Sequence, residues 1–580
     1  MYTPRPMGEG KASMLRERRG MVAMPPTQHY GRKALCKTLA HLKQERSSWD
    51  SHYAELGRFQ LPRVPRFYAK DRNKGGKKHR ELYNDAATRA LRVGAAGMMA
   101  GTCNPSTKWF EITTADPELA LHNAAALWLQ DSGQRMRTTF ERANTYLSVH
   151  SMYESKMAFG TACNVVLPDR DTAIWHYPSP IGEFYAATDY RGIVATLYRV
   201  YAMTVREIVE QFGIENCSEE VRRLQAQGSL EEQVEVCNAI ERRRDRNPEL
   251  LDNLNMPWKS CWFETAADDA HDVLLRESGF RRFPALVSRW WLEGNDVYGG
   301  CPGMDALGKI KGLQLRELEQ AQAIEYSARP PMFAHSSLKG RGVNLLPHGI
   351  TYGDNMGTQP MVRPAYEINP ATIPHMRADM DRVEAAINEA YLKDLFLMMS
   401  QVSDTTQRTA EEIIERRQEK LIVLGPAYFR AQRELLSPLV ELCFWEMFEQ
   451  GRLAPLPEVL EGAQLNIKFV SVMAQALQRV GQSDQDQFVV RLGAVARMKP
   501  EVLDRFDPDG WVDSQETVVD PRILVPRETA QQLRQARLAS QAAMAQAQMM
   551  EQQAATAKDL SQAQTSQPSV LTGLAGAGAG

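Results

Sequence analysis

The sequence lacks the cysteine and histidine spacing that metal sites and paired thiols require. Its eight cysteines are scattered, and no two form a CxxC pair or stand at zinc-ligand spacing. This excludes the common zinc modules and indicates small buried thiols in a reducing cytoplasm. The eleven histidines are equally dispersed, without a catalytic-triad or ligand pattern. We therefore expect neither a metal nor another cofactor.

The motifs of nucleotide and hydrolase chemistry are missing too. There is no GxxxxGK[ST] loop to hold phosphates, no HExxH and no GxSxG. Long apolar runs are also absent, because the most apolar stretch, residues 90–101, is too short and glycine-rich to cross a bilayer. The Arg-rich N-terminus has no signal-peptide core. We expect a protein that is not an enzyme, contacts no membrane and is made in a cytoplasm.

Neither sign of charge is in excess, since 69 basic residues stand against 71 acidic ones. A protein that wraps nucleic acid by neutralising phosphates normally has a basic surplus. The balance argues against DNA wrapping but is compatible with DNA passing nearby. With 43% hydrophobic residues, the 580-residue chain can bury sizeable cores in three or four domains, or in one elongated fold of several segments.

What the sequence does contain is a series of patterns that predict a mainly helical α+β fold. Apolar residues at helical spacing predict helices, and short aromatic or β-branched runs between Pro and Gly predict strands. The predicted helices span residues 38–61, 93–99, 119–148, 205–212, 234–244 and 488–498. The predicted strands lie within 108–112, 164–200, 258–264, 287–292 and 465–470.

Two long helices flank a compact excursion in the middle of the chain. Apolar residues from Leu307 to Ala328 fit one helical face, which ends at Pro330-Pro331. From Met376 to Tyr391, apolar residues again advance in steps of three or four. The Gly- and Pro-rich residues between them contain short strand-like pieces. The pattern predicts a hairpin of two helices joined by a β-containing cap.

After this hairpin the sequence predicts a kinked helix and a weakly packed tail. The helix begins near Thr409 with a capping-box pattern and runs toward Phe448. Pro426 and Pro438 must kink or interrupt it. The Gln/Ala-rich residues 528–557 favour helix but have almost no core of their own.

Several segments, each weak as a motif, follow one another in a specific order. They are LYNDAATRA (82–90) with GAAGMMAG (94–101), MAFGTA (157–162), PALVSRW (284–290) with YGGCPG (298–303), and RTAEEI (408–413). In this order they resemble the portal proteins, or head-to-tail connectors, of short-tailed phages over most of residues 30–510. Glu411 departs from the second Thr that relatives tend to carry, which leaves the helix-cap argument intact.

The resemblance implies a portal fold, in which identical subunits, usually twelve, form a ring at one capsid vertex. The implied parts are a wing (1–302), stem helix 1 (303–328), a β-containing clip (329–371), stem helix 2 (372–396), a channel loop (397–408), a kinked long helix with wing return and crown (409–525), and a C-terminal helical barrel or disordered tail (526–580).

The resemblance also implies the partners of such a ring. Besides further copies of the chain, they are the major capsid protein, a scaffolding protein, the terminase large subunit, a tail adaptor and internal core proteins. Double-stranded DNA would pass through the channel without specific contacts during packaging and ejection. The protein would thus belong to the virion and be synthesised in the bacterial host cytoplasm.

The expected channel lining consists of side chains on the second long helix and in the loop after it. Five carboxylates against three basic groups between Arg377 and Asp394 would repel phosphate at close range. The solvated face of an amphipathic helix and an ordinary helix connection explain the same pattern. The predicted lining residues are Asp379, Asp381, Glu384, Glu389, Met398, Met399, Ser403 and Gln407.

Other interpretations stay open at this point. A tail adaptor would also form a ring, but adaptors are usually shorter. A DNA-packaging ATPase or nuclease is disfavoured by the missing phosphate loop, and a helical cytoplasmic scaffold by the dispersed strands. The basic run 70–80 and residues 507–510 favour a solvated loop and a turn over sites for DNA and calcium. Trp290 and Trp291 favour a core or subunit interface over base stacking.

Overall fold

The computed structural model divides the chain into a large unit, Met1–Val480, and a smaller unit, Gly481–Gly580. Both helices and strands are present, as the sequence predicts. None of the described helices combines the length and the apolar character needed to cross a membrane. The described residues are 31–67, 81–116, 119, 122–250, 252–267, 272–334, 339, 362–365, 369, 371–400, 422–477, 492 and 527–566.

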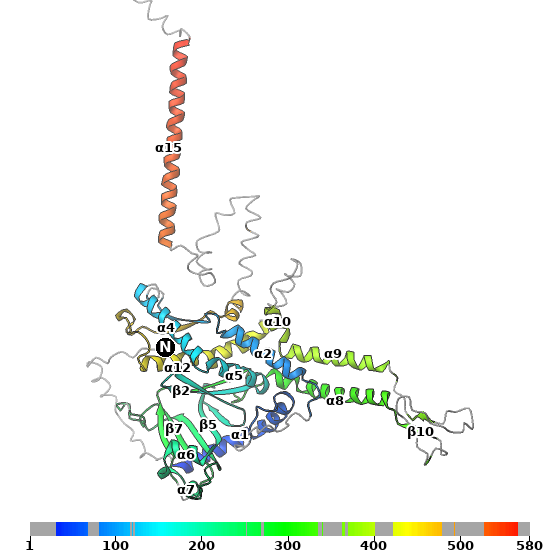
Figure 1. Cartoon of the computed structure of the whole chain (residues 1–580). Coiled ribbons are helices and arrows are strands. Elements are labelled where there is room, and N and C mark those ends of the chain that lie inside the picture. Colours follow the sequence, from blue (N-terminus) through cyan, green and yellow to red (C-terminus); the bar gives the residue numbers. More distant parts are fainter. Residues whose placement is uncertain are drawn as a thin grey trace, which may run out of the picture. The chain divides into compact units, whose positions relative to one another are not determined.

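A five-stranded antiparallel sheet forms one part of the large unit (Figure 1). On one face, Leu35, Leu39 and Leu42 of helix α1 (Arg32–Gln60) pack against the sheet. The other face meets α6 (Val205–Phe212) and α7 (Glu219–Ala226). The strands in spatial order are β4 (Phe184–Thr188), β5 (Val194–Thr204), β6 (Gln233–Arg242), β7 (Trp258–Glu264) and β8 (Arg276–Phe280). A short 3₁₀ turn, η1 (Ile214–Asn216), joins α6 to α7.

The helix predicted over 234–244 is wrong, because these residues form strand β6 in the middle of this sheet. Val236 belongs to the core under α6, whereas Cys237 and Ala239 belong to the core under α1. Both faces of the strand are therefore apolar. A short apolar run buried on both sides has no clear alternation, so periodicity alone does not separate it from a helix.

A second, three-stranded sheet lies beside helix α5 (Thr145–Phe159). Its spatial order is β3 (Ala173–Ser179), β2 (Thr161–Asp169) and β9 (Ala285–Arg289). The single helix predicted over 119–148 is instead split into α4 (Asn123–Arg142) and α5. The split occurs where Asn144 bonds to the backbone of His176, accepting from its N–H and donating to its carbonyl, both at 2.9 Å. A partner 32 residues away thus decides the break.

Two long antiparallel helices, α8 (Pro302–Ala328) and α9 (Thr372–Ala390), lie side by side and project from the body as an arm (Figure 1). The short strands β10 (Met332–Ala334) and β11 (Val362–Pro364) pair at its far end. The helix pair predicted in the middle of the chain is therefore present.

The second arm helix ends at Ala390, six residues before the predicted Phe396. Leu392 adopts a left-handed conformation with φ of 55°, and a new helix, α10 (Lys393–Ser400), starts after it. The corner packs on α2 (Ala86–Thr102), where a Cβ on Gly97 would lie 2.2 Å from Phe396. The glycines of α2 make this close approach possible.

The long helix predicted toward Phe448 is present up to Glu449, and it is irregular directly before Pro438, one of the two prolines expected to kink or interrupt it. Residues 422–431 are helical, and the π-helical turn η3 (Gln432–Leu436) leads into α12 (Ser437–Glu449). Because a proline cannot donate the i→i−4 hydrogen bond, a π-turn directly before it absorbs the irregularity. The predicted start near Thr409 lies outside the described residues.

Two distant strands close the core of the large unit. β1 (Phe110–Thr114) pairs antiparallel with β12 (Leu465–Phe469), near the 3₁₀ turn η4 (Glu458–Leu460). This agrees with the strands predicted at 108–112 and 465–470.

The smaller unit contains one described helix of 40 residues, α15 (Arg527–Ser566). This confirms the helix predicted over 528–557. The predictions for residues 70–80, 507–510 and most of 488–498 lie outside the described residues.

Candidate functional site

The base of the arm is fixed by a network of side-chain amides. The Gln314 amide oxygen on α8 accepts from the backbone N–H groups of Tyr83 and Asn84 at 2.7 and 2.9 Å. Its amide nitrogen donates to the Asn84 carbonyl at 2.7 Å. The Asn84 side chain in turn donates to Glu384 on α9 at 2.8 Å and to Glu317 on α8 at 3.2 Å. The segment before α2 therefore ties both arm helices to the body.

A second set of hydrogen bonds fixes the corner after α9. The hydroxyl of Tyr391, which is fully buried, is 2.7 Å from the amide oxygen of Gln60. The Gln60 amide nitrogen donates to the Gly303 carbonyl at 2.9 Å. Burial raises the pKa of Tyr391 well above its usual value, so the phenol stays protonated and can donate. The two sets of hydrogen bonds together join the body-side parts of α8 and α9 to the rest of the large unit.

The predicted channel-lining carboxylates occupy two different environments. Asp379 is 2.9 Å from Arg316 across the two arm helices, and Glu384 accepts from Asn84. Asp381 is exposed, in a surface pair with Arg377 at 3.2 Å, and Glu389 is exposed as well. Two of the four carboxylates therefore bind another segment of the chain, whereas Asp381 pairs only within α9 and Glu389 is exposed and forms no ion pair with a described residue.

The remaining predicted lining residues lie at or beyond the edge of the described chain. Met398 and Met399 belong to α10, but their side chains are outside the described part. Ser403 and Gln407 lie outside the described residues entirely.

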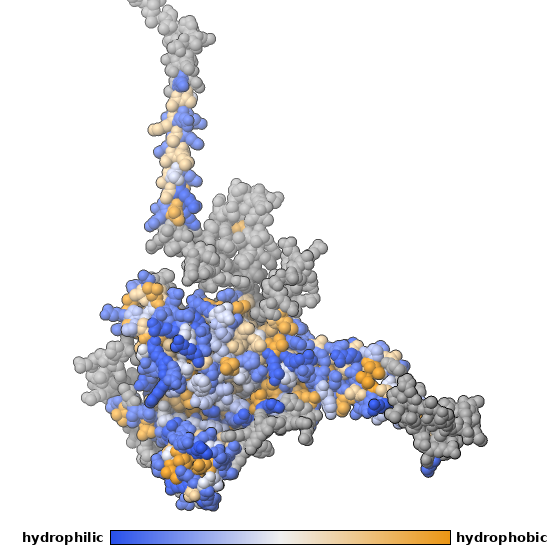
Figure 2. Space-filling model, in the orientation of Figure 1, coloured by the Kyte–Doolittle hydropathy of each residue, from blue (hydrophilic) through white to orange (hydrophobic). Residues whose placement is uncertain are grey.

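Apolar side chains are exposed along the arm, where Figure 2 shows hydrophobic residues interrupting a hydrophilic surface. Leu315 is 56% exposed and Tyr326 is 50% exposed. On the same face of α8, Gly308 has open space where a side chain would be, and Gly312 meets only the tip of Arg316. Large exposed apolar groups beside such flat positions are typical of surfaces that another helix covers.

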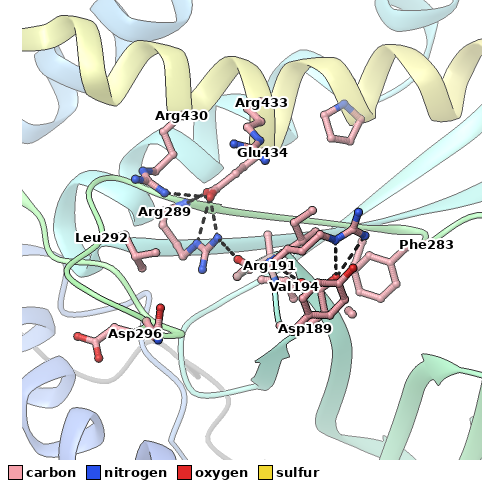
Figure 3. Close-up of a pocket in the computed structure, with 18 of the residues that line it drawn as sticks. Asp189, Arg191, Val194, Phe283, Arg289, Leu292, Asp296, Arg430, Arg433 and Glu434 are labelled. Atoms are coloured by element: carbon pink, nitrogen blue, oxygen red, sulfur yellow. Dashed lines mark hydrogen bonds and ion pairs between the residues drawn. The ribbon is translucent and has the colours of Figure 1, made fainter.

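The body contains a cleft, which we call the arginine cleft, with a volume of about 780 Å³ (Figure 3). It lies between the β4–β5 turn (189–195), β9 with the loop 292–296, and the helix over 426–442. Its charged lining comprises six arginines (Arg191, Arg242, Arg282, Arg289, Arg430 and Arg433) and four carboxylates (Asp189, Asp296, Glu434 and Glu441).

The floor of the arginine cleft is a buried ionic cluster. The Arg289 guanidinium, 4% exposed, donates to the Glu434 carboxylate at 2.7 and 3.2 Å, and its backbone N–H donates to the other oxygen at 2.8 Å. Arg430 also donates to Glu434, at 3.3 Å. Sequence reasoning missed this cluster, because its members come from strands and helices more than 100 residues apart and form no local motif.

Lys156 of α5 lies behind this cluster, fully buried. Its amine has no hydrogen-bond partner among the described residues, and it lies 5.8 Å from the centre of the Trp290 ring. Burial lowers the pKa of Lys156 to about 7, while Glu434 acts in the opposite direction. Trp290 itself is 3% exposed and belongs to the core, as the sequence predicts.

The described thiols are not placed for nucleophilic chemistry. Seven of the eight cysteines are buried, and no disulfide joins any two of them. Burial raises the pKa of Cys103, Cys163 and Cys301 to about 12 in each case, so these thiols stay protonated. Within the described part of the chain, no three His, Cys, Asp or Glu side chains gather as metal ligands.

Comparisons with known proteins give a consistent result. The family described as bacteriophage head to tail connecting protein matches residues 32–521. A probable portal protein of Bordetella phage BPP-1 is 42% identical over 543 residues, covering 93% of this chain and 97% of that protein. The portal protein of Salmonella phage epsilon15 is 40% identical over 550 residues, covering 94% and 98%.

Similarity to solved structures is weaker. A chain from the virion of a native gene transfer agent particle is 12% identical, with a TM-score of 0.31, covering 74% of this chain and 91% of that chain. That likeness is too low to define the fold.

Proposed function

This chain belongs to the bacteriophage head to tail connecting protein family and is a portal subunit, and we propose that its α8–α9 arm is the stem around the DNA channel. Portal subunits are structural, non-enzymatic parts of the virion at a capsid vertex. They form a ring there and dock with the capsid and the tail.

The observation that carries this proposal is the pair of long antiparallel helices with a small β-cap (Figure 1). Neither helix buries much of its outer half against its own chain, and a projecting pair of this kind is stable only when neighbours cover it. Copies around one axis would cover these surfaces. The stem then consists of residues 302–328 and 372–390, shorter at its second end than the sequence suggests.

We propose that the next copy in the ring packs on the outer face of α8. Gly308 and Gly312 let a helix approach closely, and Leu315 supplies apolar area.

The exposed carboxylates suit the channel wall. Asp381 and Glu389 bond to no other structural element among the described residues, so ring symmetry would repeat them around the axis. A wall with repeated negative charge repels phosphate and lets DNA slide.

Helix α15 has the pattern expected of a tube of parallel helices. Leu533 and Met544 are 11 residues apart, as are Leu538 and Met549, and all four side chains are exposed. Since 11 residues make three turns, each pair forms one ridge. The ridges are about 140° apart around the helix. Two such ridges match one neighbour on either side, which favours a barrel over a disordered tail for residues 526–580.

The remaining assignments follow the family. The wing comprises residues before Pro302, the clip 329–371, the channel loop 397–408, and the return and crown 409–525. We propose a ring of twelve copies. Its partners are the major capsid protein, a scaffolding protein, the terminase large subunit, a tail adaptor and internal core proteins, with double-stranded DNA in the channel.

Electron microscopy of the purified full chain tests the stem. We expect closed rings whose lumen is walled by α8 and α9. Leu315→Glu should lower the yield of rings, because a charge would be buried between copies. Leu147→Glu, at a leucine of α5 that is 77% exposed, is the matched control and should leave ring yield unchanged. Rings in which the arms point away from the lumen would contradict the proposal.

A further inference from the structure

The arginine cleft is lined by six arginines and four carboxylates, and one of the arginines, Arg282, pairs outside the lining with Glu449 at 3.2 Å. Glu434 is taken up by Arg289 and Arg430, and Asp189 by Arg191 at 3.3 Å. Arg433, exposed on the π-turn, forms no ion pair with a described residue. Asp296 lies on the opposite side of the cleft from Arg433 (Figure 3). The cleft therefore attracts a negatively charged group toward Arg433.

Arg242 adds a second such charge. It lies at the end of β6, with its guanidinium 5.9 Å from the centre of the Trp258 ring and no carboxylate partner among the described residues. An arginine held against an aromatic face keeps its donors free for a ligand and loses little entropy on binding. Arg433 and Arg242 thus form two separate anchor points in the lining of one cavity.

The same cavity carries apolar surface. Phe429, on the helix one turn before Arg433, is 59% exposed. The partly buried ring of Phe283 and the proline rings of Pro426 and Pro438 also line the cleft. Aromatic and arginine side chains gathered in one hollow are enriched at protein–protein interfaces.

Hydrogen bonds hold together the segments that line the cleft beside Arg433. Arg289 donates three hydrogen bonds to Glu434, and its guanidinium donates another to the Gly192 carbonyl at 3.0 Å. They join the β4–β5 turn, β9 and the π-turn that carries Arg433. A preformed site loses little free energy to reorganisation when it binds a ligand.

We propose that the arginine cleft binds an acidic peptide segment of another protein. Carboxylates of the segment meet Arg433 and Arg242, and one of its apolar side chains lies against Phe429. Nucleic acid fits less well, because its backbone has no apolar side chain to place against Phe429, and Asp296 and Glu441 in the same hollow would repel a continuous row of phosphates more than a few carboxylates. The site is separate from the stem, so it does not depend on how the arms line the channel.

Fluorescence anisotropy on the full chain tests this inference. The probe is a fluorescein-labelled nonapeptide of Glu and Leu residues, and the reference probe has Gln at every Glu position. We expect the Glu peptide to bind about tenfold more tightly than the Gln peptide, with affinity falling as salt rises. The double variant Arg433→Ala/Arg242→Ala should lose about tenfold in affinity for the Glu peptide. Phe429→Ser should weaken both probes.

The matched control removes two exposed arginines elsewhere, Arg135→Ala/Arg206→Ala, and should bind the Glu peptide like the unchanged chain. Equal losses in the two double variants would mean general charge attraction and would overturn the proposal. So would equal binding of the two peptides. A duplex oligonucleotide that binds only when Arg433 and Arg242 are present would reassign the cleft to nucleic acid. Loss of rings in the cleft variant, without peptide binding, would reassign it to a second copy of the chain.

Discussion

At the scale of single residues, the least expected feature is a lysine amine enclosed in the core. Burial disfavours the protonated form of Lys156 and lowers its pKa, Glu434 favours that form, and the nearby Arg430 and Arg289 act against it. Nothing in the sequence around Lys156 marks it as buried. The residues that surround Lys156 come from β9 and the helix over 422–449. The apolar pattern of α5 shows on which face of α5 a residue lies, but not which other elements cover that face.

Replacing Lys156 with Met should stabilise the body, and more so at lower pH. Burial lowers the pKa of Lys156 from its ordinary value of 10.5 to about 7 in the folded chain. The unfolded chain therefore binds more protons between these values, and stability rises with pH across that window. The variant should gain about 4 kcal/mol in free energy of unfolding at pH 7 and about 1 kcal/mol at pH 9.5. Urea unfolding at both pH values measures this, with the exposed Lys37→Met as control. An equal gain at both pH values would show that the buried amine stays charged.

At the scale of elements, the periodicity of apolar residues predicts correctly those helices and strands whose ranges depend on local contacts. Helices α6, α8 and α15 and strand β7 agree with their predicted ranges to within a few residues, except at the end of α15. The failures occur where a distant partner decides. Asn144 ends a helix by bonding to His176, and strand β6 is apolar on both faces because α1 and α6 cover it.

The predicted end of α9 is wrong for the same reason, because distant residues determine the corner that follows it. Tyr391 and Leu392 fit a helical pattern in the sequence. In the structure the Tyr391 side chain points inward to Gln60, and the chain changes direction where it packs against the glycines of α2. The candidate site was likewise predicted only in part. The charge pattern identified the helix that carries Asp381 and Glu389, but Asp379 and Glu384 meet partners that lie 63 and 300 residues away in the sequence.

The glycines of α2 and α8 predict opposite effects of the same substitution. A Cβ on Gly97 would lie 2.2 Å from Phe396, so Gly97→Ala forces α10 away and should cost about 1–3 kcal/mol. Gly308 has open space and a helical backbone, so Gly308→Ala should stabilise the isolated subunit by about 0.5–1 kcal/mol. Denaturant midpoints of the two variants, measured on dissociated subunits, provide the comparison. Equal shifts of the same sign would contradict the packing described for the corner.

At the scale of the whole molecule, the proposed stem would repeat one weak local charge in every copy of the ring. A single exposed carboxylate on α9 has little effect on DNA, because solvent and salt screen it within about 10 Å. In a ring, each copy places the same carboxylate at the same height around the axis. In the proposed channel the repeated charge would act on every phosphate that passes, so its effect on DNA movement should be much larger than its effect on ring stability.

Neutralising the exposed carboxylates should therefore slow DNA packaging without preventing ring formation. In the double variant Asp381→Asn/Glu389→Gln, phosphates lose the repulsion that keeps DNA from adhering to the wall, and the rate of packaging into particles should fall several-fold at low salt. The matched control is Glu384→Gln, whose amide oxygen can still accept from Asn84 and whose charge faces the arm's base rather than the exposed surface. Ring yield from electron microscopy and packaged DNA per particle over time measure the two effects separately. If the double variant and Glu384→Gln package DNA equally fast at low ionic strength, the exposed face of α9 does not line the channel, and α8 becomes the wall.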